Sequence, residues 1–418
     1  MHLVTLIVIA CVLWPADAAS YPIYGSESTG IRRLDYARLV QEGAIKGTRR
    51  PPGELLTLDQ VEPRLMHRRD LQIPVPDPVF TARIVDLLGS NADRYGIAVL
   101  DLSDIDRPRY AQHNSETVHN PGSVGKIVVA TALFQALADA YPDDLETRRR
   151  VLRETRVTAD DFIIHDSHNV KFWDPGTQKL SRRPIQIGDG ASLWEFVDWM
   201  MSPSSNAAAS TVIKQAMLLH RFGQGYPLSD VKTTEFFNVT RPTELGELLA
   251  RTLQDPLQRS GIDLNGLRQG SLFTKTGKRK VPGTTSHATS RALMTYLLRL
   301  EQGLIVDEFS SREIKRLLYM TERRIRYASS PALNEAAVYF KSGSLYKCEP
   351  EPGFVCLKYH GNKQNLMHSV AIVESPAAGR RLYYFVTLVS NVLRKNSAVD
   401  HQTLATRIHR LIESAHAE

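Results

Sequence analysis

The segment that decides the fold is Asn120-Pro-Gly-Ser-Val-Gly-Lys126, which leads directly into IVVATALFQALADAY at residues 127–141. The Asn-Pro-Gly start favours a turn. The residues after it are apolar around most of the circumference of a helix, whereas a surface helix keeps one polar side. The pattern therefore predicts a turn followed by a helix that is enclosed by protein, with Ser123 and Lys126 near its start.

Ser123 and Lys126 have the spacing that acyl transfer by serine needs. Side chains three residues apart share one face of a helix, so an unprotonated lysine can approach the serine hydroxyl. Loss of hydration in an enclosed helix would lower the pKa of the lysine toward that of a base. The same S-x-x-K spacing at Ser229 and Ser344 does not open a long apolar helix. We interpret Ser123 as a nucleophile and Lys126 as its base; a helix cap with a lysine that reaches solvent is the alternative.

A second candidate element is Ser204-Ser205-Asn206, between a helical stretch at 192–201 and another that starts at Ala207. A hydroxyl and an amide at such a turn could relay a proton and hold a substrate amide. A plain helix N-cap is the alternative. Ser167-His168-Asn169 has the same S-x-N letters without a clear helix on each side.

A third element is Lys341-Ser342-Gly343-Ser344, which follows the strand-like residues 336–340. The lysine could attract a substrate carboxylate, and the glycine would let the backbone approach so that an amide N–H points at an oxyanion. Lys275-Thr276-Gly277 has similar letters but runs into a basic cluster and a Pro-Gly turn. We prefer Lys341 because two further strands follow it.

The periodicity of the rest of the chain predicts an α+β, or mixed α/β, arrangement. A strand pair comes first, helices fill the middle, and two strands and a closing helix end the chain, so both chain ends contribute to one sheet. The expected strands are 95–102, 109–112, 368–374 and 382–390, and the expected helices are 77–89, 127–141, 192–201, 289–300 and one that includes 404–412.

Taken in order, the three motifs resemble the signature of penicillin-binding proteins and serine β-lactamases. The flanking segments 96–102, 192–209 and 283–289 resemble class A β-lactamases in particular. The resemblance covers about Asp77 to Ala415. It implies a β-lactamase/transpeptidase-like fold, in which an antiparallel sheet is flanked by helices and accompanied by an all-helical subdomain.

By this resemblance, Ser123 would be the acylated nucleophile, Lys126 its activating base and Ser204 a proton relay. Class A enzymes also carry an E-x-x-L-N loop whose glutamate activates the deacylating water. No segment between 207 and 283 reproduces that loop. The nearest match offers Glu244, which we take as the candidate, or Glu247; a poorer match offers Glu235, and 162–184 would be an extra loop or hairpin.

The resemblance also assigns a substrate site. Asn206 would bind a substrate amide, and Lys341 and Ser342 would hold a carboxylate. Gly343 would allow close approach, and the backbone N–H of Ser344 would join that of the nucleophile in an oxyanion hole.

The first residues of the chain are typical of an exported protein. Residues 1–18 combine an apolar run with an A-x-A cleavage pattern, which is typical of a signal peptide. This favours a periplasmic or secreted protein over lipidation at Cys11.

Residues 19–76 look like an extension that ends in a stiff Pro-rich linker, and we expect residues 77–418 to form the catalytic domain. Cys348 and Cys356 would remain after cleavage and suit a disulfide across a turn, with two free thiols as the alternative.

Composition limits the partners. The 418 residues have a formal net charge of +7, 42% apolar and 23% charged residues, which excludes a disordered or fibrous chain. The basic residues are scattered and no aromatic stripe accompanies them, so we expect no nucleic-acid partner. His165-Asp-Ser-His168 fits a polar loop better than a metal fragment, and we expect no cofactor and no metal. We expect a monomer without a transmembrane segment in the mature chain.

The sequence thus predicts a secreted, class A β-lactamase-like serine hydrolase that acts on a β-lactam or a related acyl amide through an acyl-enzyme. One alternative is a penicillin-binding D,D-peptidase acting on peptidoglycan stem peptides. Another is a non-catalytic envelope-binding module that makes contact through residues 20–76.

Overall fold

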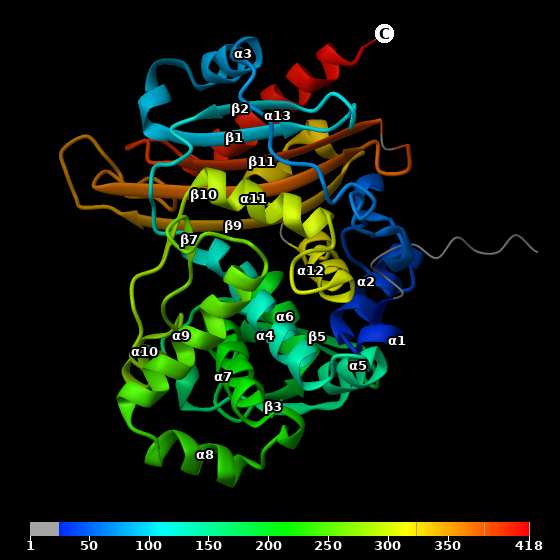
Figure 1. Ribbon diagram of the computed structural model, residues 1–418, viewed down its shortest axis with the longest axis vertical. Helices are drawn as coiled ribbons and strands as arrows, with labels where there is room; N and C mark the ends of the chain where they lie inside the picture. Colours follow the sequence, from blue (N-terminus) through cyan, green and yellow to red (C-terminus); the bar gives the residue numbers. More distant parts are fainter. Residues whose placement is uncertain (1–24, 323, 380, 418) are drawn as a thin grey trace, which may run out of the picture.

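The computed structural model describes residues 25–322, 324–379 and 381–417 (Figure 1). The predicted signal peptide therefore lies outside the described residues. The helices are α1 (Gly25–Thr29), α2 (Arg32–Glu42), α3 (Pro78–Leu88), α4 (Lys126–Ala140), α5 (Leu145–Glu154), α6 (Leu193–Met201), α7 (Asn206–Phe222), α8 (Asp230–Val239), α9 (Pro242–Arg259), α10 (Lys275–Lys280), α11 (Ser290–Glu301), α12 (Glu308–Tyr319) and α13 (Ser397–Ala415). The strands are β1 (Tyr95–Asp101), β2 (Arg109–His113), β3 (Arg156–Thr158), β4 (Asn169–Asp174), β5 (Lys179–Pro184), β6 (Gly190–Ser192), β7 (Leu267–Arg268), β8 (His287–Ala288), β9 (Ala337–Lys347), β10 (Gln364–Ser375) and β11 (Leu382–Ser390).

The central sheet joins the two ends of the chain, as predicted. Among the described strands it has the order β2-β1-β11-β10-β9, and every pairing is antiparallel. Side chains alternate between its faces. Ile97 and Val99 of β1 pack in one apolar core with α3 and α13, whereas Ala98 and Leu100 belong to the other core, to which α4, α7, α11 and α12 contribute. The predicted mixed fold with an antiparallel sheet is confirmed, and β9 forms one edge of that sheet.

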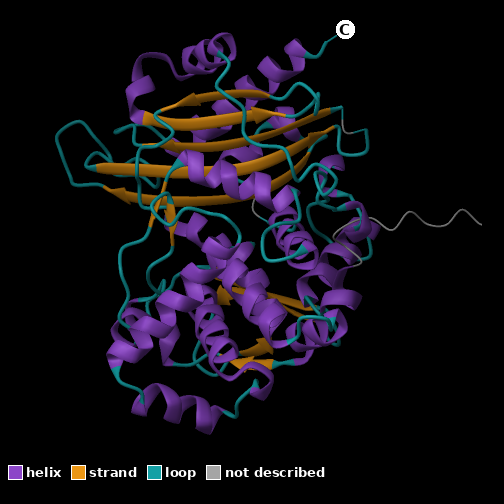
Figure 2. Cartoon of the chain, viewed as in Figure 1, coloured by secondary structure: helices purple, strands orange, loops and turns teal. Residues whose placement is uncertain are grey.

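Helices cover the sheet on both faces and form a separate region below it (Figures 1 and 2). In that region α4 is buried at every position except Ala138 and Asp139, as its apolar circumference predicted. Residues 122–140 are long and apolar enough to cross a membrane, and within the described chain no other helix is. However, 83% of that window is buried inside the protein, so the segment serves as the core helix of the fold.

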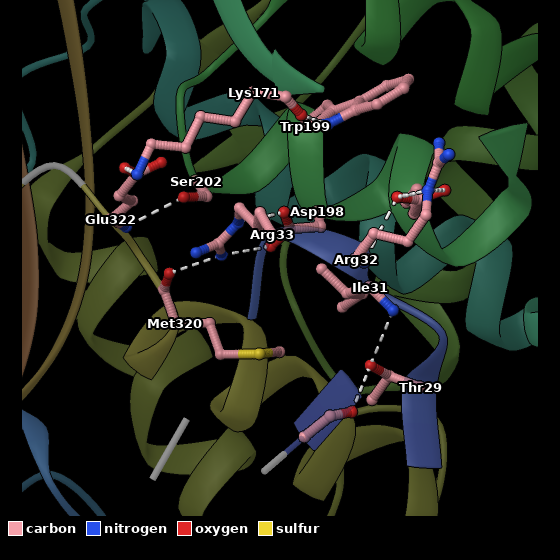
Figure 3. Close-up of polar contacts among 12 residues, drawn as sticks. Thr29, Ile31, Arg32, Arg33, Lys171, Asp198, Trp199, Ser202, Met320 and Glu322 are labelled. Atoms are coloured by element: carbon pink, nitrogen blue, oxygen red, sulfur yellow. Dashed lines mark hydrogen bonds and ion pairs between the residues drawn. The ribbon is translucent and has the colours of Figure 1, made fainter. Parts of the chain in front are cut away.

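The described part of the predicted extension, residues 25–76, packs against the domain and is not a free linker. Ile31, Leu34 and Leu65 are buried in the same apolar core as the helices. Arg33 donates hydrogen bonds to Asp198 of α6 at 2.5 and 2.6 Å and to the Met320 carbonyl at 2.9 Å (Figure 3). The short apolar pieces of residues 25–76 are separated by Pro and Gly and show no periodicity. For this reason the sequence did not reveal that the segment packs against the domain.

Two smaller features complete the frame. Strands β4 and β5 form the hairpin expected within 162–184. A disulfide joins Cys348 and Cys356, with the Cα atoms 5.8 Å apart, and confirms the predicted pairing. It closes part of the loop between β9 and β10, which projects beyond the sheet (Figure 1).

Candidate active site

Ser123 lies on a single 3-10 turn, Gly122–Gly125, that leads straight into α4. Edge strand β9 packs its backbone against this turn. A Cβ atom at Gly343 would lie 2.4 Å from the Pro121 carbonyl oxygen and 2.8 Å from the Ser123 nitrogen, so only glycine fits there. A Cβ atom at Gly122 would be at ordinary contact distance, 3.4 Å, from the Ser344 nitrogen, so the turn and β9 lie directly side by side. The nucleophile candidate and the K-S-G-S strand therefore meet, as predicted.

Lys126 reaches back to the serine from the first residue of α4. Its Nζ donates hydrogen bonds to Ser123 Oγ at 3.0 Å, to Asn206 Oδ1 at 2.8 Å and to the Ser204 carbonyl at 2.7 Å. The side chain is fully buried, and this burial lowers the pKa of Lys126 to about 7, although the charge of Asp166 acts in the opposite direction. A lysine in this state can accept a proton near neutral pH.

Ser204 links the two buried lysines. Its Oγ accepts hydrogen bonds from Lys126 Nζ at 3.2 Å and from Lys341 Nζ at 2.8 Å. Its backbone φ is +65°, a left-handed conformation that a residue other than glycine rarely adopts without local constraint. Burial and the positive charges of Lys126 and Arg326 hold the pKa of Lys341 well below its usual value. The chain of contacts Ser123, Lys126, Ser204, Lys341 is continuous.

Arg326 adds a cation that sequence analysis missed. It comes from the turn Arg326–Ser329 and donates hydrogen bonds to Ser342 Oγ at 2.7 Å and to Ser344 Oγ at 3.1 Å. Its backbone φ is +59°, and its guanidinium stacks 4.8 Å above the Tyr359 ring. Nothing in the local sequence marks this arginine, because it reaches β9 only through the tertiary fold.

Ser123, Ser204, Lys341 and Arg326 border a cleft of about 820 Å³ between the edge of the sheet and the helical region. Among the described residues that line it, lysine and arginine occur but aspartate and glutamate do not. The cleft is therefore suited to an anionic ligand. The predicted site residues that line it are Ser123, Ser204, Asn206, Lys341, Ser342, Gly343 and Ser344.

Comparison with known proteins agrees with this geometry. The model of the family described as "Beta-lactamase enzyme family" matches residues 79–412. The chain belongs to the β-lactamase enzyme family. Membership supports a serine hydrolase of the β-lactamase and penicillin-binding type, and the match begins after the segment 25–76.

Solved structures share the fold at low sequence identity. PBP-A is 15% identical with a TM-score of 0.51, over 82% of this chain and all of that one. A PBP-A mutant, solved as an acyl-enzyme complex with penicillin G, is 14% identical with a TM-score of 0.50 over the same shares. The TLA-3 extended-spectrum β-lactamase is 14% identical with a TM-score of 0.52, over 81% of this chain and 99% of that one. No curated protein matches the chain. The predicted β-lactamase/transpeptidase fold is confirmed.

In this β-lactamase family member the structure does not bring Glu244 to the cleft. Glu244 lies in the first turn of α9, exposed and paired with Arg241. The apolar face of α9, with Leu245 and Leu248, is turned to the core, which leaves Glu244 toward solvent. Glu247 and Glu235 are exposed as well and do not line the cleft. The interpretation of Glu244 as the water-activating group is therefore corrected.

The rival lysine motif is also elsewhere. Lys275 opens helix α10 and is exposed, whereas Lys341 lies on the sheet edge beside the Ser123 turn. The choice of Lys341 over Lys275 thus agrees with where the two residues lie.

Asp166 is the second residue that sequence analysis missed. Its Oδ2 accepts hydrogen bonds from Ser205 Oγ at 2.8 Å and from the Ala207 N–H at 2.9 Å, and its Oδ1 accepts one from His168 Nδ1 at 2.5 Å. Burial would raise the pKa of Asp166, but these hydrogen bonds hold it well below its usual value. The carboxylate fixes the turn that carries Ser204 and Asn206.

The sequence showed the His165–His168 segment as a motif, but it did not show that this segment approaches α7. The described residues hold no cluster of metal-ligating side chains.

Proposed function

We propose that the protein is a secreted serine hydrolase that forms an acyl-enzyme on Ser123 with a β-lactam or a related acyl amide. The observation that carries the proposal is Lys126, buried among neutral oxygen atoms with its Nζ 3.0 Å from Ser123 Oγ. An amine that is desolvated and has no carboxylate beside it gives up its proton readily and can then take the proton of a hydroxyl.

Acylation follows from the chain of contacts. Ser123 Oγ attacks the acyl carbon while Lys126 accepts the hydroxyl proton, so a C–O bond forms as the O–H bond breaks. The C–N bond then breaks, and the leaving nitrogen takes a proton delivered from Lys126 through Ser204 Oγ. The backbone N–H groups of Ser123 and Ser344 would hold the oxyanion; loss of one such donor costs about 3 kcal/mol of transition-state stabilisation.

The other end of the cleft fits the acidic group of the substrate. A carboxylate placed at Ser342 and Ser344 would be near the cations of Lys341 and Arg326. Its negative charge would favour the protonated form of Lys341. Asn206 Oδ1 accepts from Lys126, an arrangement that orients the side-chain amide for a substrate amide.

A labelled penicillin tests this proposal. Wild-type protein should form a covalent adduct, and Ser123→Ala should form none. Ser229→Ala is a matched control, because Ser229 belongs to another S-x-x-K sequence but caps α8 and does not line the cleft. Labelling that survives in Ser123→Ala would disprove the nucleophile, and a wild type without adduct would favour a non-catalytic binding module.

A penicillin-binding D,D-peptidase is the second candidate. The observation in its favour is the lack of carboxylates among the described cleft-lining residues, since a carboxylate is the group expected to activate the deacylating water. Rapid turnover of penicillin indicates a β-lactamase. A long-lived adduct together with release of D-alanine from a stem peptide ending in D-Ala-D-Ala indicates a peptidase.

Export to the periplasm or medium belongs to the same proposal. It is supported by the A-x-A pattern at 16–18 and by the Cys348–Cys356 disulfide, since disulfides persist in oxidising compartments. N-terminal sequencing of the exported protein should start after Ala18. An intact Met1 on active protein would contradict cleavage.

A further inference from the structure

The cleft contains a second group that can move a proton. Among the described residues that line it there is no Asp or Glu, and His168 is the single imidazole. Lys126 is buried beneath the cleft and is already bonded to three residues, so it offers water little access. The acyl-enzyme would therefore have to draw its water-activating base from another side chain.

We propose that His168 is the general base that activates water to deacylate Ser123, and that Asp166 positions it. This inference rests on the acyl-enzyme function proposed above. It names the residue for the second half of the reaction, for which Glu244 was the candidate from sequence.

The contacts of His168 fix its tautomer. Its Nδ1 lies 2.5 Å from Asp166 Oδ1, and its backbone N–H donates to the same oxygen at 3.2 Å. A carboxylate only accepts hydrogen bonds, so Nδ1 carries a hydrogen, and in the neutral form of the ring Nε2 is the nitrogen with the lone pair. Nε2 makes no hydrogen bond to any residue in the described ranges, and the side chain is 33% exposed at the cleft.

Asp166 ties this ring to the catalytic turn. The carboxylate is 3% exposed and bonds to Ser205 and to the Ala207 N–H. Asn206 lies between these two contact residues in the sequence, and Ser204 directly precedes them. Both Ser204 and Asn206 bond to Lys126. One buried carboxylate therefore holds both the imidazole and the turn that contacts the base of Ser123.

The deacylation step balances without a further reactant. A water oxygen bonds to the acyl carbon as His168 Nε2 takes one of the water protons. The bond between that carbon and Ser123 Oγ then breaks, and the serine oxygen receives the proton held by His168. The products are the free acid and the Ser123 hydroxyl.

Rapid-quench kinetics of the full mature chain with penicillin G can separate the two halves of the reaction. In His168→Ala we expect the acylation rate to stay close to that of wild type. The deacylation rate should fall about 10²- to 10⁴-fold, so that the adduct persists. Added imidazole should speed deacylation, since the truncated side chain leaves room in a partly exposed site. His165→Asn is the matched control: it lies in the same loop, is exposed and does not line the cleft, and asparagine tolerates its positive φ.

The outcomes are decisive. Selective loss of deacylation with rescue by imidazole supports the proposal. If His168→Ala deacylates at the wild-type rate, the proposal is overturned. This includes the case in which both proteins form equally long-lived adducts. Selective loss without rescue, or a parallel loss of acylation, shows a structural role and overturns it too. If wild-type protein forms no adduct, the proposed function itself has failed; if only the deacylation arm fails, the function stands and His168 does not.

Discussion

Two groups of buried cations in this protein differ in what surrounds them. Lys315 is fully buried and donates to Glu301 at 3.0 Å and to Glu374 at 2.9 Å. Arg33 is equally enclosed and bonds to Asp198 (Figure 3). Lys126 and Lys341 are just as deeply buried, yet the hydrogen bonds of their Nζ atoms go only to neutral oxygens.

The surroundings of a buried cation determine whether it stabilises the fold or can take part in a reaction. A buried charge is costly unless an opposite charge offsets its lost hydration. In the first group carboxylates offset the lost hydration of the cations. These ion pairs hold α6, α12 and the N-terminal segment together. In the second group no carboxylate of the described residues bonds to either Nζ, the charge of Asp166 only partly opposes the effect of burial, and the pKa of Lys126 falls to about 7. An amine in that state contributes little to stability but is able to act as a base.

The largest expected effect comes from removing the unpaired base. In Lys126→Met the acylation rate of Ser123 should fall about 10²- to 10⁴-fold, because the base bonded to the serine hydroxyl is removed. The unfolding free energy should change less than in any variant of the paired group, since no carboxylate loses its partner. Single-turnover labelling and urea denaturation measure the two quantities. An acylation rate within a few-fold of wild type would remove Lys126 from the mechanism.

The paired group should show the opposite behaviour. Lys315→Met should lower the unfolding free energy by about 3–5 kcal/mol, because buried Glu301 and Glu374 would each lose the ammonium to which they bond. Adding Glu301→Gln and Glu374→Gln to this variant should recover part of the loss. Denaturant unfolding of the single and triple variants checks both expectations. A triple variant less stable than Lys315→Met would show that uncompensated charge is not the cause.

A smaller effect is expected at the anion end of the cleft. Arg326→Gln should raise KM for a β-lactam about 10- to 100-fold, the range expected for one charged hydrogen bond, with a lesser change in kcat. Steady-state kinetics distinguishes this from a folding defect, provided that the unfolding midpoint is measured alongside. An unchanged KM would separate Arg326 from substrate binding.

The smallest effect is expected at the exposed ion pair. Glu244→Gln breaks the pair with Arg241 on the surface of α9, where solvent screens both charges. We expect neither the deacylation rate nor the unfolding midpoint to change measurably. Slower deacylation in this variant would return Glu244 to the role that the sequence suggested.

The main elements of the catalytic cluster could be predicted because they are local. Ser123 and Lys126 share one turn, Ser204 and Asn206 share another, and each motif adjoins a strongly patterned helix or strand. The order of the motifs then placed Lys341 on a strand, and β9 does carry it. Both sheet-forming chain ends were visible for the same reason, since their strands are continuous apolar runs.

What could not be predicted depends on contacts between distant segments. Arg326 adopts a positive φ in a short turn and has no pattern around it. Asp166 was seen within a His-Asp-Ser-His sequence, but only the folded chain shows its oxygen bonded to the start of α7. Arg33 likewise meets Asp198 across 165 residues of sequence. Long-range pairing of this kind leaves no periodicity in one sequence.

The pH dependence of Ser123 acylation tests the central claim most directly. If the base is Lys126 with a pKa of about 7, the single-turnover rate should rise about tenfold per pH unit below that value and level off above it. The rise has this sign because the neutral amine is the active form. A rate that stays flat between about pH 5 and 8, or that keeps rising toward the usual lysine value of 10.5, would contradict the account.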